Sequence, residues 1–283
     1  MLICNLTGNL GNHLFQYALT RRVAEANGYE WGINPIPEYD YHNGKPQMDF
    51  LDINYGVQHS YKYSTLPDGF DVWEEKYDVR LGSNNKEYKY FPFQPEVFAI
   101  RNNTKLIIPC AQHAYYFNRK KLMEWFKIAE WLKAKHVSII HSLGVDDINT
   151  TVINVRGGEY KGVPDLLLNK AYWNNAIFLM KERNPDMRFV CVTDDVEYAS
   201  ELFSNMPVIH LSIGGDYYII NNARNLILSN SSFAIFPTWL NKNKPFVIAP
   251  KYWARHNVSA GRWANSYMPS FPWNFMGRDG SLS

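Results

Sequence analysis

The sequence has little cysteine, little charge and no long apolar run. Its three cysteines, Cys4, Cys110 and Cys191, are far apart and form no CxxC or Cys/His pattern, which argues against a disulfide framework and a structural zinc site. Charged residues make up 20% of the chain, against roughly 25% in a typical soluble domain. The formal net charge is +2, and no basic run is longer than Arg119 to Lys121. We therefore expect neither a nucleic-acid partner nor binding to an anionic membrane surface.

The chain also lacks the signals of membrane insertion and export. No stretch of about 18 consecutive apolar residues occurs, and residues 1–11 contain no basic segment followed by an apolar one. We therefore expect a cytoplasmic protein without a membrane span. Glycine and proline, at 17 and 15 of 283 residues, are near their usual frequencies, which excludes a low-complexity or disordered chain. No feature of the sequence indicates an oligomeric state.

The order of apolar runs predicts an α/β protein. A short strand at residues 1–5 leads through a glycine loop into a helix that ends at Gly28. Residues 35–95 show no long periodic pattern, residues 117–135 predict a second helix, and residues 141–150 are a candidate linker. Strands are then predicted at 151–156, 188–192, 208–211, 226–229 and 246–249, and helices at 169–183, 195–203, 216–223 and 233–241. Such alternation is typical of a doubly wound parallel sheet, which binds ligands at the carboxyl ends of its strands.

Two of these strand ends combine glycine with polar residues. In residues 8–13, glycines and a helix N-terminus suit an anionic ligand, but a tight structural turn explains them equally well. The second strand end places Arg156 beside Gly157 and Gly158, where its guanidinium can clamp a phosphate while Glu159 accepts a proton. The alternative is a solvated turn with an Arg–Glu pair.

Two further strand ends carry acids and hydroxyls. One of Asp194 and Asp195, by default Asp195, caps the next helix, and the other can bind a ribose or a guanine edge or, less favoured, a metal ion. The segment Ser229 to Ser232 leads into a helix, where hydroxyl groups cap the helix and bind phosphate. Four such strand ends in one chain favour a nucleotide or sugar-phosphate ligand.

These segments resemble the motifs of the α-1,2-fucosyltransferase family, glycosyltransferase family 11. Residues 8–18, GNLGNHLFQYA, are similar to its GGLGNQMFQYA, and residues 228–241, LSNSSFAIFPTWLN, to its ISNSTFSWWGAWLN. Residues 153–160, INVRGGEY, stand where the family has HVRRGDY. Weaker matches are Thr193 to Asp195 with (S/T)DD, Gln112, Tyr116 and Phe117 with GYFQxxxYF, and residues 247–253 with (V/I)IAPxxW.

The resemblance implies a GT-B fold, in which two Rossmann-like halves face each other across a cleft. It also implies an inverting, metal-independent transfer of fucose from GDP-fucose to a galactose 2-hydroxyl or a related acceptor. GDP-fucose is then the donor substrate, a glycan is the acceptor, and no cofactor is needed. Residues 1–140 would form the acceptor-side domain, and residues 141–283 the domain that binds the nucleotide sugar.

The resemblance also implies roles for single residues. Arg156 would neutralise the β-phosphate of the leaving GDP, and Asn12 would reach the sugar-phosphate junction of the donor. Negative charge grows on the diphosphate in the transition state, so a preplaced arginine accelerates the step. The candidate donor-binding residues are Gly11, His13, Arg156, Asp194, Asp195, Ser229, Asn230, Ser231 and Ser232.

The chain departs from the family motifs at several positions. Asn154 replaces a histidine, Gly157 the second arginine, Glu159 an aspartate and His13 a glutamine. The missing arginine removes a positive charge from the donor site, for which Lys161 and Arg224 are the candidate replacements.

Glu159 is the candidate catalytic base, because it is the carboxylate nearest to Arg156 in sequence; His13 and Asp165 are the alternatives. Two other functions stay open. They are transfer from a different nucleotide sugar on the same fold, and binding of a nucleotide or glycan without turnover.

Aromatic residues are abundant, at 16% of the chain, and such rings line sugar sites or fill cores. Trp125, Phe126 and Trp131 lie on a predicted helix, and we expect them to pack. Other rings lie in the irregular N-terminal region, where stacking on the acceptor sugar is expected: Trp31, Tyr39, Tyr41, Tyr61, Tyr63, Trp73, Phe91 and Phe93.

Overall fold

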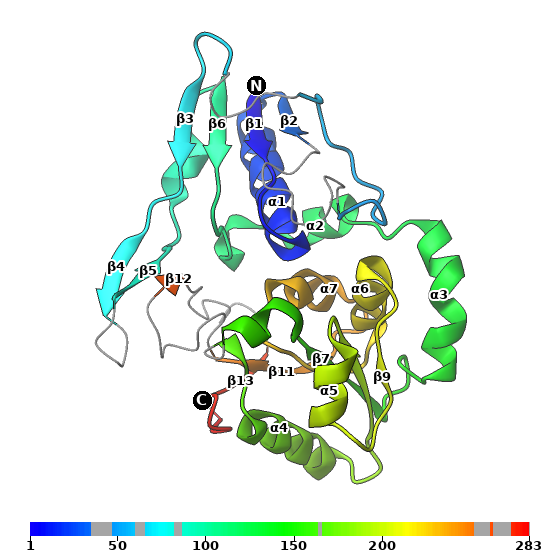
Figure 1. Ribbon diagram of the computed structural model, residues 1–283. Helices are drawn as coiled ribbons and strands as arrows, with labels where there is room; N and C mark the ends of the chain where they lie inside the picture. The colour runs from blue at the N-terminus through cyan, green and yellow to red at the C-terminus, as the bar shows by residue number, and fades with distance from the viewer. Residues whose placement is uncertain are drawn as a thin grey trace. The chain divides into compact units, whose positions relative to one another are not determined.

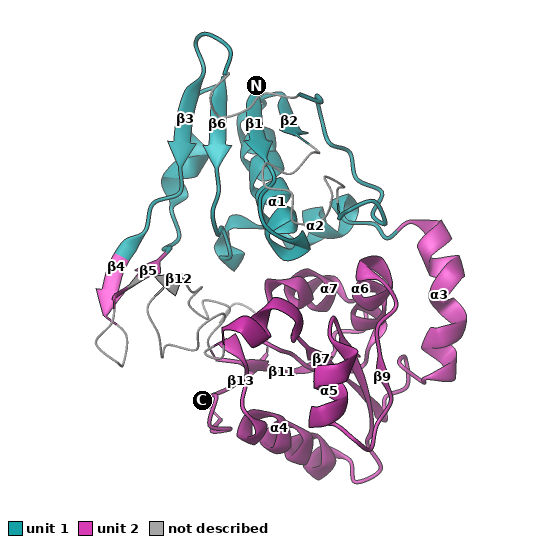
Figure 2. Cartoon of the chain, viewed as in Figure 1, with its two compact units in different colours: residues 1–78, 91–128 teal, residues 79–90, 129–283 magenta. Residues whose placement is uncertain are grey.

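The computed structural model of the chain contains two parallel β-sheets and a small third one (Figure 1). It describes residues 1–34, 47–59, 66–81, 87–163, 166–251, 261–262 and 273–282. Contacts divide the chain into two compact units (Figure 2). The first consists of Met1–Asp78 and Phe91–Ile128, and the second of Val79–Tyr90 and Ala129–Ser283. The predicted α/β class is confirmed.

The first unit holds a four-stranded sheet in the order β2, β1, β6, β3, in which all neighbouring strands are parallel. Its strands are β1 (Leu2–Asn5), β2 (Trp31–Asn34), β3 (Asp71–Glu74) and β6 (Thr104–Ile107). The helix α1 (Leu10–Asn27) ends, as predicted, at Gly28, which takes the left-handed conformation with φ 67°. Short helical segments complete the unit: η1 (Pro95–Ala99), η2 (Ala114–Tyr116) and α2 (Arg119–Trp125).

The second unit holds a six-stranded parallel sheet in the order β13, β11, β10, β7, β8, β9. Its strands are β7 (Thr150–Val155), β8 (Arg188–Thr193), β9 (Val208–Ile209), β10 (Asn225–Ile227), β11 (Phe246–Pro250) and β13 (Asn274–Met276). Its helices are α3 (Glu130–Ser142), η3 (Gly158–Gly162), α4 (Lys170–Arg183), α5 (Val196–Leu202), α6 (Ile213–Asn222), η5 (Ser232–Ala234) and α7 (Ile235–Leu240). The alternation predicted from residue 151 onwards is confirmed. No helix in the described part of the chain is long and apolar enough to span a membrane.

Apolar side chains at helical spacing attach α4 to this sheet. Tyr172, Trp173, Ala176 and Met180 are buried in one cluster with Ile153 of β7. Burial of one large apolar side chain contributes about 1.5–3 kcal/mol, so the cluster holds α4 firmly against the sheet. All six residues of β7 are buried, which fixes the position of the residues that follow this strand.

Some strands were not predicted. The strand β3, together with β4 (Asp78–Leu81) and β5 (Glu87–Tyr90) of the small third sheet, lies in the stretch without periodicity. The strand β4 alternates polar and apolar side chains (DVRL), but over only four residues, which is too short to predict a strand, and all four are exposed. The parallel pairing of β5 with β12 (Gly261–Arg262) explains why residues 79–90 group with the second unit.

The helix predicted at residues 117–135 is two helices, α2 and α3. The chain leaves the helical conformation at Phe126, which has φ −104° and ψ 52°. The Lys127 carbonyl that follows accepts a hydrogen bond from the Asp52 N–H at 2.8 Å. A tertiary contact therefore interrupts a pattern that locally favours a helix.

The segment predicted as a linker begins inside α3, which continues to Ser142, and the rest of it is a turn before β7. A domain boundary after residue 140 would place α3 in the first unit. Its packing against α6 groups it with the second unit instead, so the two units divide after Ile128.

The aromatic residues named in the sequence analysis differ in how far they are buried. Trp125 and Phe126 are buried, as predicted, but Trp131 is 54% exposed because Leu132 and its helical neighbours form the buried face of α3. Phe91 is buried. The rings of Trp31, Trp73 and Phe93 are half-buried, and Tyr39, Tyr41, Tyr61 and Tyr63 lie outside the described residues.

His113 lies in an aromatic cluster after β6. Its ring centre is 5.1 Å from that of Tyr115 and 5.6 Å from that of Phe93, and the residue is 6% exposed. Burial lowers the pKa of His113 from its ordinary value of 6.5 to about 4.

We predict that this buried histidine makes the fold less stable as the pH falls from 6.5 towards 4. The unfolded chain binds a proton at His113 below pH 6.5, whereas the folded chain does so only below about 4. Across that window the free energy of unfolding therefore falls by up to about 3 kcal/mol. Thermal unfolding of the wild type and His113→Gln over this pH range measures the effect, and the variant should show the smaller pH dependence. The exposed His141, changed to Gln, is the control. Equal pH dependence in the wild type and His113→Gln would contradict the prediction.

Candidate functional site

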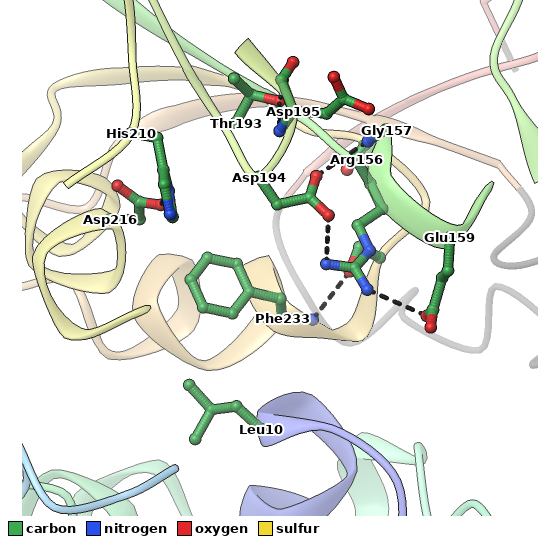
Figure 3. Close-up of polar contacts among 12 residues, drawn as sticks. Leu10, Arg156, Gly157, Glu159, Thr193, Asp194, Asp195, His210, Asp216 and Phe233 are labelled. Carbon is green, nitrogen blue, oxygen red and sulfur yellow. Dashed lines mark hydrogen bonds and ion pairs between the residues drawn. The ribbon is translucent and has the colours of Figure 1, made fainter. Parts of the chain in front are cut away.

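Four neighbouring parallel strands bring polar residues to one edge of the second sheet (Figure 3). Arg156 follows β7, Asp194 follows β8, His210 follows β9, and residues 229–232 follow β10. Because the strands are parallel, their carboxyl ends meet at the same edge, where doubly wound sheets bind ligands.

Arg156 lies between two carboxylates. Its Nη1 is 2.6 Å from Oδ2 of Asp194, and its Nη2 is 3.0 Å from Oε1 of Glu159 (Figure 3). The side chain of Glu159 is 60% exposed, against 27% for that of Asp194. Asp194 therefore holds the guanidinium from the neighbouring strand, and Glu159 is the partner that an incoming anion displaces more easily.

Gly157 allows the backbone to approach α5 closely. Its N–H donates to Oδ1 of Asp194 at 2.9 Å. A Cβ atom at position 157 would lie 2.6 Å from Cβ of Asp195 and 2.9 Å from Cδ1 of Tyr198. This backbone has no room for a side chain, so the second arginine of the family motif cannot be accommodated here.

Asp195 and Lys161 form a second ion pair, in which Nζ lies 2.5 Å from Oδ2. The Asp195 carboxylate also accepts the N–H of Tyr198 at 3.1 Å, which confirms its prediction as the N-cap of α5. Burial acts to raise the pKa of Asp195, but the hydrogen bonds from Lys161 and Tyr198 hold it below its ordinary value. Lys161 thus brings a positive charge to the edge where the second arginine is missing.

Ser231 connects the segment after β10 with the segment after β7. Its hydroxyl is hydrogen-bonded to that of Tyr160, whose ring centre is 5.5 Å from the Arg156 guanidinium. Burial raises the pKa of Tyr160 to about 12, against the opposing effects of Arg156 and Ser231. Ser231 Oγ also accepts the N–H of Phe233 at 3.3 Å and caps η5, as predicted, and Ser232 is half-buried.

The side chains of Ser229 and Asn230 make hydrogen bonds within the fold. Ser229 is 1% exposed and donates to Oδ1 of Asn154 at 3.1 Å, and Asn154 donates in turn to the Val192 carbonyl at 3.4 Å. Asn230 is 3% exposed and donates to the Leu166 carbonyl at 2.9 Å. Direct contact of Ser229 and Asn230 with a donor stays a prediction.

Two residues at this edge, His210 and Asp216, were not singled out from the sequence. His210 Nδ1 lies 2.6 Å from Oδ2 of Asp216, whose other oxygen accepts the N–H of Leu211 at 3.0 Å. Burial raises the pKa of Asp216 to about 6, although the Leu211 N–H and His210 oppose this rise. The helix predicted to begin at Asp216 begins at Ile213 and is capped by Ser212, which places the acid on the buried face of α6. An acid within an otherwise apolar helical pattern is the signal that could have revealed it.

In the first unit, α1 begins at Leu10, so Gly11, Asn12 and His13 form its first turn rather than a loop. His13 is 1% exposed and Gly11 is buried. Asn12 is half-buried, and its Oδ1 accepts a hydrogen bond from Nε2 of Gln112 at 3.1 Å. Asn12 is thus the residue of this turn whose polar side chain is partly accessible.

Two candidate residues from the sequence analysis, Arg224 and Asp165, are not found among the polar residues that the structure describes at the carboxyl ends of the strands. Arg224 precedes β10 and donates Nε to the Asp146 carbonyl ahead of β7, at the amino ends of these strands, so it does not replace the missing arginine. Asp165 lies outside the described residues. In the described ranges, no three His, Cys, Asp or Glu side chains come close enough together to hold a metal ion.

A sequence model described as glycosyl transferase family 11 matches residues 77–275. The chain belongs to glycosyltransferase family 11. This confirms the resemblance to the α-1,2-fucosyltransferase family. The family 11 enzyme is 25% identical over 272 residues to an alpha-1,2-colitosyltransferase of Escherichia coli. This alignment covers 89% of the chain and 92% of the relative. It is 24% identical to the O-antigen biosynthesis glycosyltransferase WbnK of Escherichia coli, over 92% of the chain and 98% of the relative.

Solved structures share the fold of the family 11 enzyme. POFUT1 in complex with GDP-fucose matches with a TM-score of 0.50 and 9% identity, over 84% of this chain and 92% of that one. The complex of POFUT1 with GDP matches with a TM-score of 0.51 and 8% identity, over 92% of this chain and 96% of that one. At this identity the likeness shows the fold alone, and it confirms the predicted GT-B class.

We predict that Gly157→Ala destabilises the family 11 enzyme by about 1–3 kcal/mol, because the new Cβ atom overlaps Asp195 and Tyr198. The matched control is Gly162→Ala in the same η3 segment, where a Cβ atom would have no atom within 4 Å apart from those of its chain neighbours. Denaturant unfolding of both variants measures the difference, and equal stabilities would contradict the prediction.

Proposed function

We propose that this family 11 enzyme transfers fucose from GDP-fucose to the 2-hydroxyl of galactose in a glycan, with inversion at the anomeric carbon. The observation that carries the proposal is the Arg156 guanidinium, held by Asp194 at the carboxyl edge of the parallel strands. The family match, the α-1,2 linkage in the name of one relative and the GDP-fucose complex of the structurally similar POFUT1 support it.

Arg156 is suited to hold the diphosphate of the donor, because a guanidinium offers paired, coplanar N–H groups to phosphate oxygens. One of its two carboxylate partners, Glu159, is largely exposed. An exposed ion pair contributes at most about 1 kcal/mol, so the diphosphate replaces Glu159 at little cost. Asp194 keeps its own bond and preserves the orientation of the guanidinium.

Displaced from Arg156, Glu159 serves as the base. In the transfer step, the acceptor oxygen bonds to C1 of fucose and the bond from C1 to the β-phosphate oxygen breaks. The proton of the acceptor hydroxyl passes to Glu159, and the departing electron pair stays on GDP. Arg156 is already in place to balance the charge that develops there, and Lys161 adds a second positive charge at the same edge. Asn12 contacts the sugar-phosphate junction, and no step is assigned to a metal ion.

GDP-colitose is the second candidate donor, because one relative is named as a colitosyltransferase. Colitose is the 3-deoxy analogue of fucose, so the two donors share the nucleotide and differ at a single hydroxyl group. The Arg156 guanidinium would bind the diphosphate of both donors equally well. A direct comparison of the two donors decides between them.

We predict that the wild type releases GDP from GDP-fucose in the presence of a galactose-terminated acceptor, and that Arg156→Ala lowers kcat/KM by about 10²- to 10³-fold. The reason is that the variant loses the group that stabilises the leaving diphosphate. A coupled assay of GDP release measures the rate, and NMR of the product identifies the linkage. Arg224→Ala, at the amino ends of the strands, is the matched control and should stay within about twofold of the wild type.

The same assay is run with GDP-colitose, UDP-sugars and dTDP-sugars. Faster turnover with GDP-colitose would assign colitose rather than fucose as the transferred sugar and keep GDP as the nucleotide. Faster turnover with a UDP- or dTDP-sugar would overturn the assignment of the donor. Saturable GDP binding without any transfer would identify a binding module. If Arg156→Ala turned over at the wild-type rate, Arg156 would not be the residue that stabilises the leaving diphosphate.

We predict that Glu159→Gln lowers kcat by about 10²- to 10⁴-fold, with a much smaller change in the KM for the donor, because the amide cannot accept the acceptor proton. Glu159→Asp, which restores the residue type of the family motif, should retain part of the activity. Steady-state kinetics at saturating acceptor measure both parameters. An unchanged kcat in Glu159→Gln would exclude Glu159 as the base.

A further inference from the structure

Glu75 anchors a loop of the first unit through a buried carboxylate. It follows β3 and is 2% exposed. Its Oε2 accepts the N–H of Cys110 at 2.8 Å, and its two oxygens accept the N–H of Ala111 at 2.9 and 3.0 Å. Hydrogen bonds from N–H groups to an ionised carboxylate are among the strong ones in proteins. The loop after β6 is therefore tied to the end of β3 by this one side chain.

Ala111 is held in an uncommon conformation. Its φ is 48°, in the left-handed region that residues with a Cβ atom rarely adopt, and the residue is fully buried. The bonds from its N–H to Glu75 favour this conformation over the ordinary ones. Glu75 thus determines the direction in which the chain leaves Ala111.

The next residue, Gln112, orients the side chain of Asn12. Gln112 Nε2 donates to Oδ1 of Asn12 at 3.1 Å, which directs the Asn12 Nδ2 group the other way. A Cβ atom at position 8 would lie 2.5 Å from that nitrogen, so Gly8, with φ 77°, leaves the space it occupies. The orientation of the amide decides whether Asn12 offers a donor or an acceptor to a ligand.

We propose that Glu75 is a positioning residue for the transfer reaction. It holds Cys110 and Ala111 so that Gln112 keeps the Asn12 amide in one orientation. The inference rests on the proposed function, in which Asn12 contacts the sugar-phosphate junction of the donor. Glu75 acts through the loop and does not touch the substrate.

A double-mutant cycle tests this role. We expect Glu75→Gln and Gln112→Ala each to lower kcat/KM by about tenfold, the factor for one neutral hydrogen bond of about 1.4 kcal/mol between Gln112 and Asn12. The double variant should lie within about twofold of Gln112→Ala alone, because both changes act through the same contact. Glu74→Gln, at the exposed acid next in sequence, is the control. If the loss of kcat/KM in the double variant equalled the product of the two single losses, Glu75 would not act through Gln112 and the positioning role would be overturned. Glu75→Asp replaces Glu75→Gln in the cycle if the latter does not fold.

Thiol labelling tests the anchor without any activity. Cys110 is partly exposed, whereas Cys4 and Cys191 are buried, so a thiol reagent reports mainly on the loop that Glu75 holds. We expect Glu75→Gln to accelerate labelling of Cys110 by about tenfold, and Glu74→Gln to leave it unchanged. Unchanged labelling in Glu75→Gln would overturn the anchor. Accelerated labelling, combined with a wild type that transfers no sugar from any donor, would support the anchor and overturn the proposed function.

Discussion

The ion pair between Arg156 and Asp194 joins the ends of two neighbouring strands, and the other polar contacts of this edge are arranged around it. Asp194 uses its second oxygen for the N–H of Gly157, so one carboxylate holds both the guanidinium and the adjacent backbone. That backbone passes α5 at a distance that only glycine allows. The fully buried strand β7 supplies the fixed base from which these residues extend.

Around Arg156, acids outnumber cations. Two cations, Arg156 and Lys161, face three carboxylates, those of Glu159, Asp194 and Asp195. When the exposed Glu159 moves away, Arg156 keeps Asp194 and Lys161 keeps Asp195, and the free side of the Arg156 guanidinium can take a diphosphate. In the proposed mechanism, the binding of the donor and the availability of the base are therefore a single event, since the same guanidinium serves both carboxylate and phosphate.

The first unit is ordered by buried polar side chains in a similar way. Gln16 of α1 donates to Oγ1 of Thr7 at 2.8 Å and to the Ile108 carbonyl at 3.0 Å, which links the segments after β1 and β6. Glu75 links the end of β3 to the second of these segments. Each anchor satisfies backbone groups that would otherwise be buried without partners, which is why one side chain can determine the course of a loop.

The sequence by itself determined the parts that depend on neighbouring residues: the alternation of strands and helices from residue 151, the cap at Asp195, and the motifs that place Arg156 at a strand end in a family 11 enzyme. It did not reveal β3 to β5, which are only four residues long each, too short for their pattern to predict strands, nor the break at Phe126. Only the tertiary structure decided that Arg156 meets Asp194 and that Glu75 holds Ala111. Such contacts depend on which strands become neighbours in a sheet, and that choice follows from the packing of the whole chain rather than from local propensity.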